Sequence, residues 1–218
     1  LRKIQTFSEI IRKNLQSAEI AQKYLEKVDS SAKRMGELIK SVLNYSRLSK
    51  EGHQTTEVSL DSILKNVTQD FELLIQEKNA VVESEPLPVI RGVSLHINQL
   101  FANLIANSLK FTQGNPIIKI SARRVSREQV LNNPSNLEGT NYIEVAFKDN
   151  GIGFDQQFEK QIFTMFQRLH GKHEYSGTGI GLAVCKKIMD NHDGYITARS
   201  EVGKGATFYV YFPVHTKA

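Results

Sequence analysis

Residues 142–155, YIEVAFKDNGIGFD, join a strand-like run to one acid and two closely spaced glycines. Apolar and polar residues alternate from Tyr142 to Lys148, which predicts a half-buried β-strand. Gly151 and Gly153 follow, and glycine permits positive φ and a close approach of the backbone to a ligand. Asp149 is therefore expected at the end of a strand, beside a loop that can fold around a bound molecule.

Two further glycine groups lie downstream, at Gly177, Gly179 and Gly181 and then at 203 and 205. The sequence GTGIGLAV runs from a glycine loop directly into a predicted helix, whose free N–H groups suit a phosphate. It lacks the third glycine of G-x-G-x-x-G, and no G-x-x-x-x-G-K-[ST] is present. Ordinary turns would explain any one group alone, but the three together favour a nucleotide site outside the usual P-loop and dinucleotide folds.

A long amphipathic helix is predicted to begin at Ser94. Asn103, Asn107 and Lys110 fall on one face of it. Amide oxygens can ligate a hard cation such as Mg²⁺, and the lysine can neutralise a phosphate. Polar residues on a helix surface are an equally good explanation by themselves; the neighbouring glycine loops favour the ligand site.

The first fifty residues contain one glycine and no proline. Their apolar residues predict two antiparallel helices, the first one short, joined by the polar stretch NLQSAE. Such a hairpin has too little surface to bury alone, so a homodimer through residues 1–50, forming a four-helix bundle, is expected. Packing of the stripe against the rest of the chain is the alternative. The stripe comprises Ile4, Phe7, Ile11, Leu25, Val28, Ala32, Met35, Ile39 and Val42.

Beyond a hinge at Lys50–His53, strands and helices mix without strict alternation. We predict an α+β chain, with the helical hairpin at 1–52 and an α/β sandwich at 53–218, whose mixed sheet is covered by helices on one face. Asp61 is expected to cap a helix. The other predicted elements are strands at TEVSL, VVES, PVIRG, IIKISARR, YITARS and ATFYVYF, a short helix at 159–166, a surface loop at NNPSNLEGTN and a helix from Gly179 to about Asp190.

The bulk composition excludes several classes of protein. The net charge of +5 is spread among interspersed acids and bases, so no nucleic-acid partner is expected. The single cysteine, Cys185, supports neither an intrachain disulfide nor a zinc cluster and suggests a reducing, cytoplasmic setting. With no membrane-length apolar run, this chain is expected to make no membrane contact, although its parent could be tethered elsewhere.

Four segments, in this order, resemble the N, G1, F and G2 boxes of sensor histidine kinases: NQLFANLIANSLKFT, DNGIGFD, IFTMFQRL, and the run from GTGIGLAV to FYVYFP. The hairpin is similar to the dimerisation and histidine-phosphotransfer domain of that family, so the resemblance spans nearly the whole chain. It implies binding of ATP or ADP with Mg²⁺ and transfer of a phosphoryl group to a histidine, and then to an aspartate on a response-regulator receiver domain.

The resemblance also assigns roles. Asp149 would accept a hydrogen bond from the adenine amino group, Asn107 would ligate Mg²⁺, and residues 167–176 would form a mobile lid. The catalytic residues would be Asn103, Lys110 and Arg168, with Arg168 on the terminal phosphate. The nucleotide-binding residues would be Asn103, Asn107, Lys110, Asp149, Gly151, Gly153, Phe163, Phe166, Gly177, Thr178, Gly179, Gly181, Leu182 and Thr207.

Two positions bear on activity. The family carries its phosphoaccepting histidine just before the segment that LRKIQ resembles, and residues 1–50 contain no histidine. We therefore expect these 218 residues to bind nucleotide and dimerise without autophosphorylating; the alternative is a non-catalytic nucleotide-binding module. Asn103 stands where the related gyrase, Hsp90 and MutL ATPases have a glutamate base, and an amide cannot accept a proton at neutral pH, which favours kinase chemistry over steady hydrolysis.

Overall fold

The computed structural model describes residues 2–48, 54–132, 141–169 and 177–214. The chain divides into two compact units, Leu1–Arg47 and Leu48–Ala218. This division falls close to the expected junction between residues 52 and 53. The expected hinge at 50–53 lies outside the described residues, as does most of the predicted loop that begins at Asn132.

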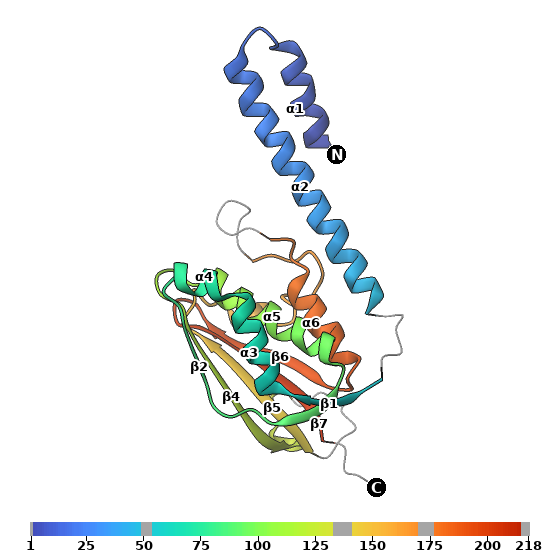
Figure 1. The fold of residues 1–218 in the computed structure, drawn as a ribbon, viewed down its shortest axis with the longest axis vertical. Helices are drawn as coiled ribbons and strands as arrows, with labels where there is room; N and C mark the ends of the chain where they lie inside the picture. The colour runs from blue at the N-terminus through green and yellow to red at the C-terminus, as the bar shows by residue number, and fades with distance from the viewer. Residues whose placement is uncertain (1, 49–53, 133–140, 170–176, 215–218) are drawn as a thin grey trace. The chain divides into compact units, whose positions relative to one another are not determined.

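The first unit is a helical hairpin (Figure 1). Helix α1 (Arg2–Lys13) is the short one and α2 (Ala18–Arg47) the long one, as the apolar spacing predicts. The turn is closed by hydrogen bonds from Asn14 N–H to the Ile11 carbonyl and from Ser17 N–H to the Asn14 carbonyl, each 3.0 Å. Across the hairpin the rings of Phe7 and Tyr24 lie 5.7 Å apart. The predicted helical hairpin is therefore confirmed.

The second unit is built on a mixed five-stranded sheet with the order β2-β4-β5-β7-β6. Strand β2 runs parallel to β4, and the remaining neighbours are antiparallel. Strands β1 and β3 form a separate antiparallel pair. The strands are β1 (Thr56–Ser59), β2 (Val81–Ser84), β3 (Val89–Gly92), β4 (Ile117–Ser126), β5 (Asn141–Asp149), β6 (Tyr195–Glu201) and β7 (Gly205–Pro213).

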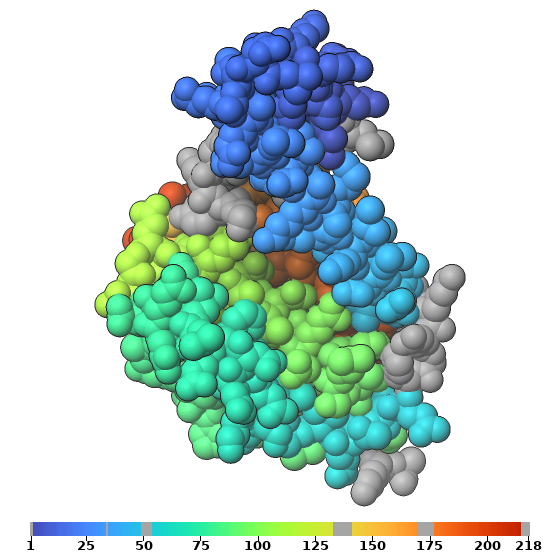
Figure 2. Space-filling model, turned by 45° about the horizontal axis from the view of Figure 1, so that its top comes forward, coloured from blue at the N-terminus to red at the C-terminus, as the bar shows by residue number. Residues whose placement is uncertain are grey.

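Helices α3 (Leu60–Asp70), α5 (Ser94–Lys110) and α6 (Gly181–Asp190) cover one face of this sheet (Figure 1). The short α4 (Glu72–Glu77) follows α3, and both lie at the surface seen in Figure 2. The predicted sandwich, with helices on one face of a mixed sheet, is confirmed. No helix among the described residues is both long and apolar enough to cross a membrane.

Helix α5 contributes much of the core because its apolar residues recur at helical spacing. The side chains of Ile97, Leu100, Phe101, Leu104 and Ile105 are fully buried. The ring of Phe101 meets that of Phe147 on β5 edge to face, with 4.9 Å between centroids, a favoured aromatic geometry. This packing fixes the rotation of α5 against the sheet and so decides which of its polar residues face a cavity.

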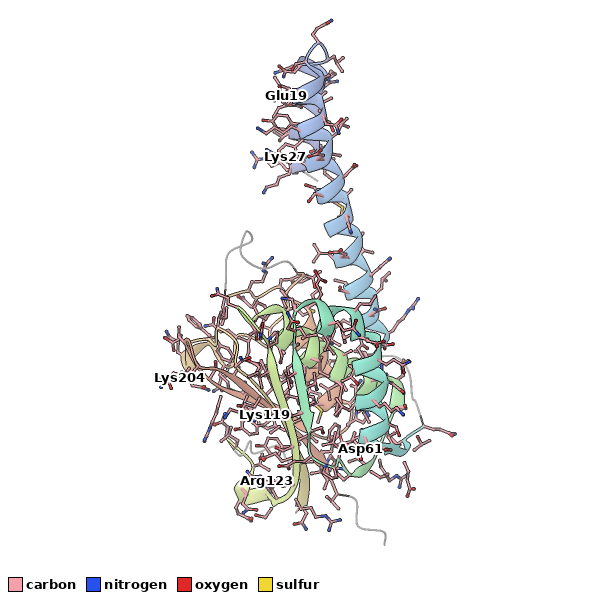
Figure 3. The ribbon with its side chains drawn as sticks, turned by 60° about the vertical axis from the view of Figure 1, so that its left-hand side comes forward. Glu19, Lys27, Asp61, Lys119, Arg123 and Lys204 are labelled. Carbon is pink, nitrogen blue, oxygen red and sulfur yellow. The ribbon has the colours of Figure 1, made fainter. Side chains whose placement is uncertain are left out.

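Two local expectations are wrong. Asp61 does not cap α3: Ser59, in extended conformation, accepts the capping hydrogen bond from Ser62 N–H. Asp61, labelled in Figure 3, instead accepts a 3.0 Å hydrogen bond from Leu87 N–H, tying α3 to the segment before β3. In place of the predicted helix at 159–166, the structure has a 3-10 helix, η2 (Gln156–Phe158), followed by turns.

His192, in the turn between α6 and β6, links α6 to the junction between β3 and α5. Its Nδ1–H donates to the Ile188 carbonyl at 2.7 Å, and its Nε2 accepts from Val93 N–H at 3.0 Å. Only the neutral imidazole can make both bonds, because Nε2 must carry a lone pair. A Cβ on Gly92 would lie 3.1 Å from the imidazole Cδ2 atom, so the ring fills the space beside β3.

This arrangement predicts pH-dependent stability. Burial lowers the pKa of His192 from its usual value, because it disfavours the imidazolium. The unfolded chain therefore binds more protons at acidic pH, and the contribution of His192 is fully present above about pH 6.5 and is lost as pH falls below it. We expect the free energy of unfolding, from urea titrations, to fall by up to about 1.4 kcal/mol per pH unit between pH 6.5 and 5.

The His192→Phe variant separates this effect from that of other groups. Asp149 and Asp190, whose pKa values are raised mainly by burial, favour the folded state as pH falls and act in the opposite sense. The phenylalanine variant should therefore lose less stability on acidification than the parent. Equal pH slopes for the two proteins would contradict the assignment to His192.

Candidate functional site

A cavity of about 260 Å³ opens in the second unit between α5, the end of β5 and the beginning of α6. One part of its wall is apolar and the other carries amide and basic groups. The apolar lining consists of Phe111, Ile152, Phe154, Ile162, Leu169, Leu182, Ala206 and Phe208. The polar lining consists of Asn107, Lys110, Asp149, Gln167, Arg168 and Thr178, with glycines 153, 177, 179 and 181.

Asp149 is held in the apolar part by three donors. Its Oδ1 accepts hydrogen bonds from Gly151 N–H at 2.9 Å and Ala206 N–H at 3.1 Å. Its Oδ2 is 3.3 Å from the hydroxyl of Ser108, which also lies 3.2 Å from the Leu104 carbonyl. The two backbone bonds fix Oδ1, and Oδ2 keeps acceptor capacity for a donor group in the cavity.

The ionisation of Asp149 reflects this setting. Burial raises the pKa of the carboxyl group, and the hydrogen bonds from Gly151, Ala206 and Ser108 offset part of the rise. The side chain is 8% exposed. A desolvated carboxylate interacts more strongly with a donor than one in water does, so Asp149 is suited to select a ligand that presents an N–H group.

Two glycines allow the backbone to close around this acid. Gly153 and Gly205 have φ of +63° and +95°. A Cβ on Gly153 would lie 2.1 Å from the Glu201 carbonyl oxygen, and one on Gly205 would lie 2.1 Å from that of Asp149. No side chain fits at either position, so the loop after β5 and the start of β7 touch backbone to backbone. Glycine is therefore required at these two positions by the close backbone contact as well as by the positive φ.

The basic part of the cavity is formed by Lys110, Arg168 and the glycine turn. Arg168 Nη1 donates to the Gly177 carbonyl at 3.0 Å. A Cβ on Gly177 would lie 2.7 Å from Lys110 Nζ. Burial, and then the charge of Arg168, lower the pKa of the Lys110 ammonium group. Two cations in a partly buried site repel one another, and an anion between them would relieve this cost.

Asn103 lies deeper, between α5 and α6. Its Oδ1 is 3.7 Å from the position of a Cβ on Gly181, at the beginning of α6. Burial raises the pKa of the neighbouring Cys185 thiol to about 12, and a hydrogen bond with Asn103 offsets part of that rise. The thiol is fully buried and free. Asn103 therefore lies next to the beginning of α6 but is not among the residues that line the cavity.

Five of the predicted nucleotide residues do not line the cavity, and Asn103, described above, is one of them. Gly151 acts through its N–H on Asp149. Phe163 is buried in the core, and Phe166, at φ +65°, is 56% exposed and donates its N–H to the Gly179 carbonyl. Thr207 lies between Ala206 and Phe208, which do line the cavity; because strand side chains alternate, it faces a hollow on the other side of the sheet.

Ser108 and, apart from Leu182, the apolar lining of the cavity were not predicted from the sequence. Phe111, Phe154 and Phe208 are ordinary core residues by pattern, and only the tertiary structure shows that they share a cavity. Ser108 follows Asn107 on α5, so its proximity to Asp149 could have been inferred once the helix face was assigned. The predicted lid falls mostly in 170–176, outside the described residues.

The donor groups of the site bear on how Mg²⁺ could bind. No group of three His, Cys, Asp or Glu residues in the described part of the chain could hold a metal ion. Asn107 offers one amide oxygen beside the two cations. Since Mg²⁺ is commonly bound through few protein ligands together with phosphates and water, the site fits a metal that arrives with a nucleotide and does not fit a resident ion.

A nucleotide-binding α/β sandwich preceded by a helical hairpin is thus the class that fold and site define. Two family models match the chain: "Histidine kinase-, DNA gyrase B-, and HSP90-like ATPase" at residues 92–216 and "His Kinase A (phospho-acceptor) domain" at residues 1–51. The chain belongs to the sensor histidine kinases, within the family of histidine kinase-, DNA gyrase B- and HSP90-like ATPases.

Curated relatives resemble this chain in sequence over part of their length. Cyanobacterial phytochrome A of Nostoc sp. PCC 7120 is 42% identical over 185 residues, covering 83% of this chain and 22% of the relative. The phytochrome-like protein Cph1 of Synechocystis sp. PCC 6803 is 34% identical over 197 residues, covering 90% of this chain and 24% of the relative. The chain thus spans less than a quarter of the length of these relatives.

Solved structures with the same fold include full-length ShkA in complex with AMPPNP, at a TM-score of 0.67 and 22% identity, covering 93% of this chain and 40% of that one. Histidine kinase ThkA in complex with the response regulator protein TrrA matches at a TM-score of 0.66 and 23% identity, covering 96% of this chain and 56% of that one. At these identities the likeness establishes the fold.

The glycine contacts give a prediction with an internal control. Gly205→Ala should lower the free energy of unfolding by about 3 kcal/mol and weaken nucleotide binding, because the new methyl group collides with the Asp149 backbone. Gly203→Ala shares a positive φ, +80°, but has nothing within 4 Å of the new Cβ, so it should cost only about 1 kcal/mol. Urea unfolding of the two variants tests this. Equal losses of unfolding free energy would show that the positive φ, and not the contact with Asp149, is the reason for glycine at 205.

Proposed function

We propose that this chain is the dimerising and ATP-binding core of a protein-histidine kinase. It would bind ATP with Mg²⁺ and direct the γ-phosphoryl group to a histidine, from which it passes to an aspartate of a response-regulator receiver domain. The observation that carries the proposal is one cavity with a buried carboxylate among apolar groups in one part and Asn107, Lys110 and Arg168 lining the rest.

The apolar part suits adenine. Phe111, Ile152, Phe154 and Phe208 offer flat, apolar contact for a base. Asp149 Oδ2 would accept a hydrogen bond from the exocyclic amine of adenine. A guanine carbonyl at the same place would face an acceptor and be rejected, since an ionised carboxylate donates nothing. This supports ATP and ADP over guanine nucleotides.

The basic part suits phosphates. Lys110 would lie beside the phosphate chain, and Arg168, now on the Gly177 carbonyl, can reach a terminal phosphate with its planar guanidinium. The free N–H groups at the beginning of α6 add a positive dipole end. Asn107 would contribute an oxygen to Mg²⁺, which neutralises phosphate charge and holds the phosphoryl group in line for transfer.

Asn103 argues against ATP hydrolysis by this site. It occupies the position from which a carboxylate would activate water, and an amide cannot take up a proton at neutral pH. We therefore assign the site to phosphoryl transfer onto a side chain, with slow loss of phosphate to water.

The first unit would supply the dimer. In the single chain, the large apolar side chains of Leu25, Ile39, Val42 and Leu43 on α2 remain 41–55% exposed. A single hairpin leaves this surface open to water, and a second copy would bury it in a four-helix bundle. The structure of ThkA with TrrA gives a precedent for a response regulator as partner of such a kinase.

Calorimetric titration of ADP, with and without Mg²⁺, tests the base site. Asp149→Asn should weaken ADP binding at least about tenfold at pH 7, because an amide placed there cannot act as a pure acceptor. In the parent, affinity should also fall as pH drops through the raised pKa of Asp149, and in the variant it should not. Saturable binding unaffected by the substitution would contradict the assignment of the adenine subsite.

Phosphate release and phosphotransfer test the reaction. With radiolabelled ATP, these 218 residues should release phosphate slowly and carry no label on histidine, since none lies within residues 1–50. The natural protein that contains this chain should become labelled on histidine if it is a kinase, and Asn107→Asp should reduce that labelling. Rapid, sustained hydrolysis by the chain would assign the site to an ATPase instead; binding without labelling of the natural protein would leave a nucleotide-binding module.

A further inference from the structure

Strand β6 is an edge of the sheet, since β7 is the only strand paired with it within the described parts of the chain. An edge strand exposes backbone N–H and C=O groups on its free side. Here the side chain of Gln156 bonds to two of them: its Nε2 donates to the Ala198 carbonyl at 3.0 Å, and its Oε1 accepts from Ser200 N–H at 2.9 Å. One amide group thereby reproduces the pair of bonds that a residue of an additional strand would make.

Ser200 extends the connection to the loop after β5. Its hydroxyl accepts a hydrogen bond from Phe154 N–H at 2.8 Å and donates one to the Gly205 carbonyl at 2.9 Å. Close by, Gly203 N–H donates to the Ile152 carbonyl at 2.7 Å. The loop is thus tied to both ends of the β6–β7 turn, in which Lys204 is labelled in Figure 3.

A third attachment continues along the strand. The Thr197 hydroxyl donates to Glu159 Oε1 at 2.7 Å. Residue 154 thus contacts residue 200, residue 156 contacts residues 198 and 200, and residue 159 contacts residue 197. The numbers rise along one segment and fall along the other, so residues 154–159 run antiparallel to β6. We call the contacts of Gln156 and Ser200 with Phe154, Ala198 and Gly205 the β6 seam.

We propose that Gln156 and Ser200 are positioning residues for the adenine subsite, an inference that rests on the proposed function. Neither residue lines the main cavity. They hold the loop whose residues Ile152, Gly153 and Phe154 do line it, and the ring of Phe154 lies 6.4 Å from that of Phe208. The loop is partly exposed. The β6 seam adds directed hydrogen bonds to the close backbone contact that Gly153 makes with Glu201.

The physical effect is preorganisation. A loop held in its binding geometry loses less conformational entropy when a ligand binds, so the loss of a seam bond lowers affinity without removing a ligand contact. The effect should be confined to the base, because Lys110, Asn107 and the glycine turn belong to α5 and to the segment before α6. Loss of a seam bond should therefore weaken the binding of ADP more than that of inorganic tripolyphosphate, which has no base.

The test is calorimetric titration of ADP and of tripolyphosphate into the 218-residue chain with single substitutions. Gln156→Ala and Ser200→Ala should each weaken ADP binding by about fivefold and leave tripolyphosphate unchanged. Ser200→Thr, which keeps the hydroxyl, should restore ADP binding. Gln156→Glu keeps the shape of the side chain but cannot donate to the Ala198 carbonyl, and should behave like the alanine variant.

Gln157→Ala is the matched control. Gln157 is adjacent and also exposed, but its side chain bonds to Asp155 within the same turn. It should bind both ligands as the parent does. Parental ADP affinity in the Gln156 and Ser200 variants would overturn the positioning role alone, as would equal weakening of both ligands. Absence of ADP binding by the parent would overturn the adenine site and the seam together.

Discussion

The arrangement of the site depends on the two hydrogen bonds that Asp149 Oδ1 accepts from Gly151 and Ala206. They join the end of β5 to the beginning of β7 around one buried carboxylate. The burial that raises the pKa of this group would favour its neutral form, and the backbone donors compensate by stabilising the anion. Because Oδ1 is fixed, Oδ2 has one defined direction in which to accept a ligand donor.

This constraint explains the glycines better than a general need for flexibility does. Gly205 carries no side chain because its Cα lies against the Asp149 backbone, and Gly153 because its Cα lies against Glu201. Where space is open, as at Gly203, only the positive φ favours glycine. The glycine groups at 151–153 and 203–205 therefore belong to one structure, the junction of two strands around an acid, although fifty residues separate them.

Much of this could be predicted from sequence because local periodicity reports burial. The heptad spacing predicted the hairpin, and the helical spacing of α5 placed Asn107 and Lys110 on a common face, where the structure shows them in one cavity. Details that local periodicity does not report depend on tertiary contacts. Phe166 takes a left-handed conformation and bonds to Gly179 where a helix was expected, and Thr207 faces away from the cavity because a strand alternates its side chains.

The β6 seam shows why the remainder could not be predicted. Gln156 and Ser200 carry no motif, and an exposed glutamine is typical of any loop. Their importance comes from the position of β6 at the sheet edge, which sequence patterns do not specify. A free edge must be protected against pairing with another chain, and here the protecting amide also holds the wall of the cavity. The protection of the edge and the geometry of the nucleotide site are therefore achieved by the same hydrogen bonds, so a substitution that frees the edge should also loosen the site.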